Sequence, residues 1–193
     1  MTQARTPFAE LAHRRRSNLR IDPDLTVDDE LLDGLIAIAA TAPNHHRTHP
    51  WRFRIITGEG RRGLGEALAE GLLADPVDDP DLLTARVAKA RSKYLRAPVM
   101  LVVASAAGAD EIGTLENRDA VSAAIQTLLL AATEVGLASL WSTGEAARST
   151  EVALFCDLDP TDTIVGLIYL GWPTAELDPV DRPMPEVARI DRA

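Results

Sequence analysis

The sequence predicts one domain in which helices surround a modest sheet, of the α/β or the α+β class. Segments with helical spacing of apolar residues alternate with strand-like segments, so the strands are separated by helices. The chain has 193 residues, of which 46% are hydrophobic, and this suits a single domain over residues 1–193. A chain of this size buries about 70% of the surface it exposes when unfolded, so its core needs no disulfide or metal.

Helices dominate the expected first half of the chain. Pro7 suits the first turn of a short helix, and the capping signal Thr26-Val27-Asp28-Asp29 precedes an apolar stripe that ends before Pro43. Apolar and arginine side chains alternate from Trp51 to Ile55, which is typical of a half-buried strand. A helix, an acidic loop and another helix are then expected over Leu64–Leu72, Ala74–Asp81 and Leu82–Ser92.

Strands and one long helix dominate the second half. The apolar run from Pro98 to Ala104 predicts a strand that is buried on both faces. A helix is expected over Asp119–Val135, and it is apolar on so many faces that a second subunit is expected to cover part of it. A strand, a helix, a strand and a proline-rich tail without periodicity follow, over Leu137–Ser142, Ser149–Phe155, Thr163–Leu170 and from Trp172 onward.

Charge and composition exclude several classes of function. The net charge of −9 makes nucleic acid and anionic membranes poor partners. No apolar run approaches the roughly 20 residues of a membrane span, and Met1–Glu10 has no signal-peptide core, so we expect a cytoplasmic protein. The single cysteine, Cys156, forms no internal disulfide and is expected in the core. The glycine pairs Gly58–Gly60 and Gly63–Gly65 are interpreted as parts of a polar turn rather than a nucleotide-binding motif, and a serine-hydrolase elbow is absent.

An arginine cluster stands out against this acidic background. Arg14, Arg15, Arg16 and Arg20 surround Ser17. Guanidinium groups bind phosphate through paired hydrogen bonds, and a hydroxyl adds another. The other interpretation is a solvated basic helix end that interacts favourably with the helix dipole. The residues alone leave both interpretations open.

Two further segments are candidates for ligand contact. His45 and His49 have the spacing of zinc ligands on a helix, but Pro43 and Pro50 oppose a long helix there, so we expect no metal site. A polar loop and a ligand-facing loop remain as alternatives. The segment Trp141–Gly144 holds small residues that allow backbone to approach a flat ligand, and a simple turn is the other interpretation.

Four motifs follow one another along the chain: Arg15-Arg16-Ser17, Ala42-Pro43-Asn44-His45 continuing to Pro50-Trp51-Arg52-Phe53, Trp141-Ser142-Thr143-Gly144, and Tyr169-Leu170-Gly171-Trp172-Pro173. In this order they make the chain resemble the nitroreductase family of flavoproteins. The resemblance runs from about Ala12 to Pro173.

The resemblance implies an α+β fold with a central mixed sheet flanked by helices, and a homodimer with an extended C-terminal tail. It also implies an FMN-dependent oxidoreductase with two FMN sites at the dimer interface. NADH or NADPH would supply electrons for a small organic acceptor, a nitroaromatic, quinone or enone, by a ping-pong mechanism. The alternative is a non-catalytic flavin-binding protein for storage or sensing.

The same resemblance implies roles for particular residues. Arg15, Arg16 and Ser17 match the motif for the FMN phosphate and ribityl chain. His45 matches a position that reaches the flavin of the other subunit, and His49 stands where the family often has Gln. Trp141, Ser142 and Thr143 match a flavin-contacting loop, in which Ser142 replaces a frequent Arg. Arg182 and Lys93 match basic positions of the family. Arg20 is not one of these matches, but it is a further candidate, with Lys93, for a cation that stabilises negative charge on the flavin. No catalytic side chain is implied, because FMN carries the chemistry.

Overall fold

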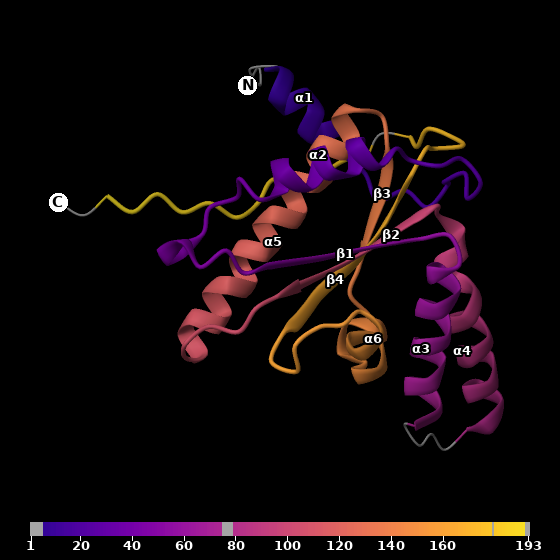
Figure 1. Ribbon diagram of the computed structural model, residues 1–193. Coiled ribbons are helices and arrows are strands. Elements are labelled where there is room, and N and C mark those ends of the chain that lie inside the picture. The colour runs from indigo at the N-terminus through magenta and orange to yellow at the C-terminus, as the bar shows by residue number, and fades with distance from the viewer. Residues whose placement is uncertain (1–5, 75–78, 179, 192–193) are drawn as a thin grey trace.

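The computed structural model describes residues 6–74, 79–178 and 180–191, and it places a sheet between two layers of helices (Figure 1). The sheet has the order β1-β2-β4-β3. Its strands are β1 (Trp51–Thr57), β2 (Val99–Ser105), β3 (Ala138–Ser142) and β4 (Thr163–Gly171). The two central strands, β2 and β4, are buried almost throughout, as their continuous apolar runs predict.

All three ladders of this sheet are antiparallel. The resemblance implied a mixed sheet. Among the described residues, parallel pairing occurs as one isolated bridge between Ser17 and Ser139. This bridge attaches the segment after the first helix to the outer edge of β3.

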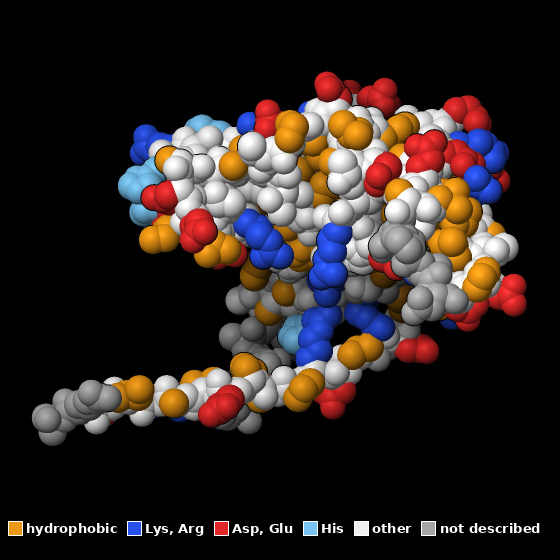
Figure 2. Space-filling model, turned by 90° about the horizontal axis from the view of Figure 1, so that it is seen from below, with side chains coloured by type: hydrophobic (Ala, Val, Ile, Leu, Met, Phe, Trp, Pro, Cys, Tyr) orange, Lys and Arg blue, Asp and Glu red, His pale blue; other side chains and the backbone are white. Residues whose placement is uncertain are grey.

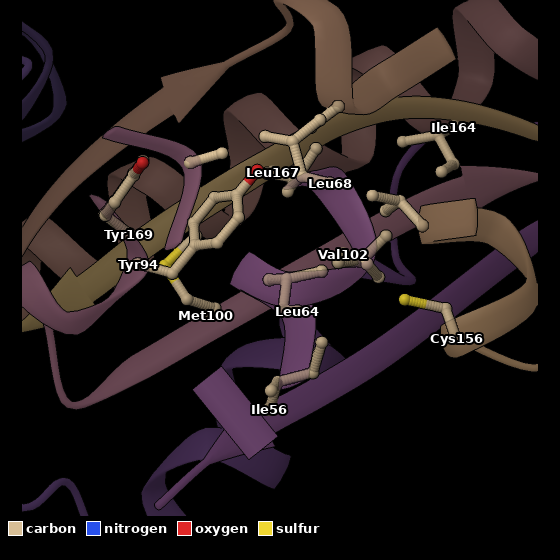
Figure 3. Packing of buried hydrophobic residues seen from close by; sticks show 14 of the residues in the cluster. Ile56, Leu64, Leu68, Tyr94, Met100, Val102, Cys156, Ile164, Leu167 and Tyr169 are labelled. Atoms are coloured by element: carbon tan, nitrogen blue, oxygen red, sulfur yellow. The ribbon is translucent and has the colours of Figure 1, made fainter. Parts of the chain in front are cut away.

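Helices cover both faces of the sheet. One face packs against α2 (Asp29–Ala39) and α5 (Glu111–Glu134). The other face packs against α3 (Gly60–Ala74), α4 (Pro80–Lys93) and α6 (Thr150–Phe155). On that second face, Leu64, Tyr94 and Cys156 pack with side chains of β2 and β4 (Figure 3). The expected core position of Cys156 is therefore confirmed.

Helix starts follow their capping residues. Thr6 caps α1 (Pro7–Arg14), and Pro7 lies in its first turn as predicted. Within the predicted capping segment Thr26–Asp29, Asp28 is the residue that accepts hydrogen bonds at the start of α2. The expected start of the long helix at Asp119 is wrong, because α5 begins at Glu111 after the cap Asp110. The first turns of α5 were missed because their apolar side chains are exposed, Ile112 by 68% and Leu115 by 62%, and give no buried stripe.

The acidic loop predicted over Ala74–Asp81 is shorter than expected. Asp79 caps α4, and Pro80 occupies its first turn, where a proline needs no hydrogen-bonding N–H. Helix α3 continues through Ala74, and residues 75–78 lie outside the described part of the chain. Three short 3₁₀ segments complete the elements: η1 (His45–Arg47), η2 (Tyr94–Arg96) and η3 (Glu145–Arg148).

The C-terminal tail after β4 has no helix or strand in its described residues. It first runs beside the N-terminal segment, where Ile21 and Pro173 form an antiparallel bridge. It then extends away from the body of the domain (Figure 1). Among the described helices, none combines the length and apolar character needed to cross a membrane.

Candidate functional site

The segment from Arg15 to Asp22 lies between β3 and the C-terminal tail. On one side, the N–H of Asn18 donates to the carbonyl of Ser139 at 2.9 Å. On the other side, the N–H of Asp22 donates to Trp172 at 2.9 Å, and that of Thr174 donates to Arg20 at 2.8 Å. Backbone pairing therefore brings together the arginine cluster, the edge strand and the tail, which are far apart in the sequence.

Asn18 fixes this junction and was not singled out from the sequence. Its side chain is buried, donates to the carbonyl of Ala175 at 3.2 Å and accepts from the N–H of Arg20 at 2.8 Å. Buried amide side chains are stable when their donors and acceptors are used. In the sequence, Asn18 is marked only by its position directly after Arg15-Arg16-Ser17. That position does not show whether its side chain is buried or exposed.

Three arginines meet at the tail end of this junction. Arg182 of the tail donates to the carbonyls of Ala12 at 3.2 Å and Arg15 at 2.9 Å. Arg16 donates to the carbonyl of Asp178. Burial, followed by the charges of Arg182 and Arg16, lowers the pKa of the half-buried Arg15. Within the described ranges, no carboxylate oxygen lies within 4.0 Å of these three guanidinium groups, although Glu176 lines the same cavity as Arg16.

A cavity of about 480 Å³ lies between Arg14 and Arg16, the end of α5 and the tail, and it is not lined by Arg15, Ser17 or Arg182. This volume is within the range of small-molecule and cofactor sites. Figure 2 shows Lys and Arg side chains gathered in the gap between the body and the extended C-terminal segment. The lining residues are His13, Arg14, Arg16, Asn18, Thr133, Gly136, Leu137, Ala138, Pro173, Ala175, Glu176 and Leu177.

The predicted flavin loop lies farther along the same edge strand. Trp141 packs over Gly166, where any Cβ would collide with the indole ring, and its Nε1 donates to the carbonyl of Val165 at 3.4 Å. Ser142 is half-buried and Thr143 is exposed. Thr143 lies about 13 Å beyond Ser139 at the rise of a β-strand. The strand thus connects the arginine cluster to this loop.

Lys93 approaches the far end of that loop from α4. Burial lowers the pKa of its amine, while the charge of Glu145, two residues beyond Thr143, raises it. The amine nitrogen lies 4.9 Å from the centroid of the Tyr94 ring, which favours a cation. A half-buried positive charge therefore stands near the end of β3. Arg20 is exposed on the segment beside the tail.

The histidine loop lies at the other end of α5. His45 is exposed, and its Nε2 is 3.9 Å from Oε1 of Glu116. His49 is exposed as well. The loop lines a second cavity, of about 540 Å³, with Pro43, Asn44, Glu116, Asp119, Ala120 and Ala123. Within the described residues, no group of three or more His, Cys, Asp or Glu could hold a metal ion.

The two cavities are well separated within one chain. Glu116 lines the cavity of the histidine loop, and Thr133 lines that of the arginine cluster. At 1.5 Å per residue, these positions are about 25 Å apart along α5. The structure therefore brings Arg15, Arg16 and Ser17 to the strand that carries the Trp141–Thr143 loop, and it places His45 and His49 of the same chain elsewhere.

Comparison with known proteins identifies the family to which this chain belongs. The family model described as "Nitroreductase family" matches residues 12–172. The chain is 31% identical over 166 residues to the Escherichia coli (strain K12) protein named "Putative NAD(P)H nitroreductase YdjA", covering 85% of this chain and 87% of that protein. The chain therefore belongs to the nitroreductase family, as its four motifs predict.

Solved structures share the fold. A nitroreductase-like family protein from Bacillus cereus superposes with a TM-score of 0.82 at 24% identity, covering 97% of this chain and 99% of that chain. The FMN- and NADPH-dependent nitroreductase NfnB from a sphigopyxis strain, as its Y88A mutant, gives a TM-score of 0.72 at 22% identity, with 95% of each chain covered. These likenesses confirm the nitroreductase-like α+β fold.

Proposed function

We propose that the chain binds FMN with its phosphate at the arginine cluster and its flat ring toward the Trp141–Thr143 loop. As a member of the nitroreductase family, the chain is an FMN-dependent oxidoreductase that uses NADH or NADPH. Names of relatives support this assignment, since YdjA is named for NAD(P)H and NfnB for FMN and NADPH. The finer proposal is that electrons pass to a small organic acceptor, a nitroaromatic, quinone or enone, in a ping-pong cycle.

The charges of Arg15, Arg16 and Arg182, which form no ion pair with a described carboxylate, carry the proposal. Like charges that stand close together without an ion-pair partner repel one another, and a bound anion relieves that repulsion. A phosphate monoester suits the cluster because guanidinium groups donate paired hydrogen bonds to its oxygens. The exposed hydroxyl of Ser17 stands beside them and can donate a further bond. The donors present therefore fit the phosphate end of FMN.

The edge strand fits the rest of the cofactor. The distance of about 13 Å from Ser139 to Thr143 allows a ribityl chain to run along β3, so that the ring reaches the loop. Lys93 would then stand near the ring as a cation that stabilises negative charge. When bound, FMN supplies the redox chemistry, by taking electrons from the nicotinamide and giving them to the acceptor. The chain binds and orients the two flat molecules, and it needs no nucleophile or general base.

A second copy of the chain would complete each site. His45 and the arginine cluster lie at opposite ends of α5. The resemblance implies that the His45 position reaches the flavin of the other subunit, so we assign His45 to the flavin of a second copy. The extended tail exposes Val180, Met184, Val187 and Ile190, each by 52% or more, and a second copy would cover them. Light scattering tests this proposal. We expect a dimer, and a monodisperse monomer of about 21 kDa that still holds FMN would contradict it.

Cofactor release and anaerobic reduction test the function. The flavin is released by heat and identified by its mass, and we expect FMN rather than FAD. NADH or NADPH is then added to the holoprotein without oxygen, and we expect rapid bleaching of the oxidised flavin. Release of FAD, or failure to take up FMN, would contradict the proposed site. Bound FMN that neither nicotinamide reduces would favour the non-catalytic storage or sensing role.

A further inference from the structure

Asn117 joins the histidine loop to α5, and we propose that it is a positioning residue that fixes His45 toward the flavin of the partner. This inference rests on the proposed function, because the flavin is the group that the loop would meet. Asn117 is a polar residue on the buried face of α5 and is only 4% exposed. It is not part of the family-like motifs, and it does not line either cavity described above.

Both polar atoms of the Asn117 side chain are used. Its Oδ1 accepts a hydrogen bond of 2.6 Å from the hydroxyl of Thr48, and its Nδ2 donates one of 3.1 Å to the carbonyl of Ala106. Ala106 directly follows β2, and its own N–H donates to Pro50 at 2.9 Å. Asn117 therefore fixes Thr48 relative to both the helix and the sheet.

The network continues from Thr48 to both histidines. The Thr48 hydroxyl accepts a hydrogen bond of 3.0 Å from Nδ2 of Asn44, which also donates to the carbonyl of His45 at 3.2 Å. The Oδ1 of Asn44 accepts from the N–H of His49 at 2.8 Å. The Thr48 hydroxyl thus connects the buried Asn117 to Asn44, whose side chain holds the backbone of the loop.

The backbone of this loop needs such support. His46, Arg47 and His49 have φ angles of 55°, 54° and 49°, in the left-handed region that residues with a Cβ rarely adopt. Residues in this region persist when surrounding contacts determine their conformation. The one regular element of the loop, η1, has three residues and supplies few hydrogen bonds of its own. The bonds from Asn117 and Asn44 therefore select this loop conformation.

Thr48 offers the sharpest test, because it is exposed and its replacement leaves the core intact. Thr48→Val keeps the side-chain shape and removes the hydroxyl, whereas Thr48→Ser keeps the hydroxyl. Thr161→Val is the matched control, since it removes another 2.6 Å hydrogen bond, from Thr161 to Asp159, in the connection before β4. The readouts are hydrogen exchange of the His49 amide and the visible circular dichroism of bound FMN.

We expect the His49 amide to exchange about 5- to 10-fold faster in Thr48→Val, because one neutral hydrogen bond no longer holds the loop closed. The visible dichroism of FMN should change in the same variant, while Thr48→Ser and Thr161→Val should match the wild type. A core that merely lost stability would not alter the dichroism of the flavin.

The outcomes separate this inference from the proposed function. If wild type binds FMN and Thr48→Val matches it in exchange and dichroism, the positioning role is wrong and the proposed function stands. Faster exchange with unchanged flavin dichroism also overturns the role, because the loop then moves without affecting the ring. A wild-type chain that takes up no FMN overturns both.

Discussion

Replacing Arg15 should weaken the binding of FMN through its phosphate. Arg15 is half-buried, and its charge lies near those of Arg182 and Arg16 without a carboxylate oxygen within 4.0 Å among the described residues. A hydrogen bond to a charged group contributes about 1.5–3 kcal/mol, so Arg15→Ala should raise the Kd for FMN roughly 10- to 150-fold. Partial burial reduces solvent screening, which favours the upper part of that range. Arg16→Ala should raise the Kd for FMN by a smaller factor, because Arg16 already donates a hydrogen bond to the carbonyl of Asp178.

Riboflavin, which lacks the phosphate, isolates this contact. Apo-protein is titrated with FMN and with riboflavin while flavin fluorescence is followed. Wild type should prefer FMN, and Arg15→Ala should lose most of that preference while its affinity for riboflavin changes little. Arg62→Ala is the control, since Arg62 is exposed and pairs with Glu59 on α3. An unchanged preference for FMN in Arg15→Ala would refute a phosphate site at the cluster.

Two other predictions concern kinetics and the buried thiol. Steady-state rates at varied NADH or NADPH and acceptor should give parallel double-reciprocal lines, because one site admits the two substrates in turn, and intersecting lines would contradict that. Burial raises the pKa of Cys156 to about 11, although Arg54 opposes the shift. The unfolded thiol loses its proton at about pH 8.5 while the folded one keeps it, so the free energy of unfolding should fall as the pH rises from there to about 11. Cys156→Ala should remove that part of the pH dependence, and an unchanged slope would show that the thiol does not contribute.

Local patterns predict elements whose apolar side chains are buried. The runs that form β2 and β4 are read directly from the sequence, because both faces of these strands are covered. The start of α5 cannot be read from the sequence in this way, because Ile112 and Leu115 are exposed and give no apolar stripe. Its cap at Asp110 was the remaining signal, and a single Asp is common in turns as well.

The candidate site shows the same limit at longer range. The cluster of Arg15 and Arg16 is visible in the sequence because adjacent arginines contrast with an acidic chain. The contacts that assemble it depend on the return of the tail, which brings Arg182 and Ala175 to residues more than 150 positions earlier. The spacing of apolar residues along a short segment predicts helices and strands, but it does not predict that the tail packs against the N-terminal segment. Asn117 was missed for a related reason, since it precedes the helix predicted over Asp119–Val135 and, as a polar residue, adds nothing to an apolar stripe.

The separation of the two cavities makes the shared site directly testable. One chain carries Arg15→Ala with Arg16→Ala, and the other carries His45→Ala; each chain has its own affinity tag, so that the heterodimer is purified. If a site combines the arginines of one chain with His45 of the other, one site of the heterodimer has both defects and the second has none. FMN titration should then show about half of the sites with wild-type affinity, while both mutant homodimers bind FMN weakly at every site. If each site were built from one chain alone, every site of the heterodimer would carry a defect and no wild-type fraction would appear. That result would overturn the role of the partner, and wild-type affinity in the His45→Ala homodimer would remove His45 from the site.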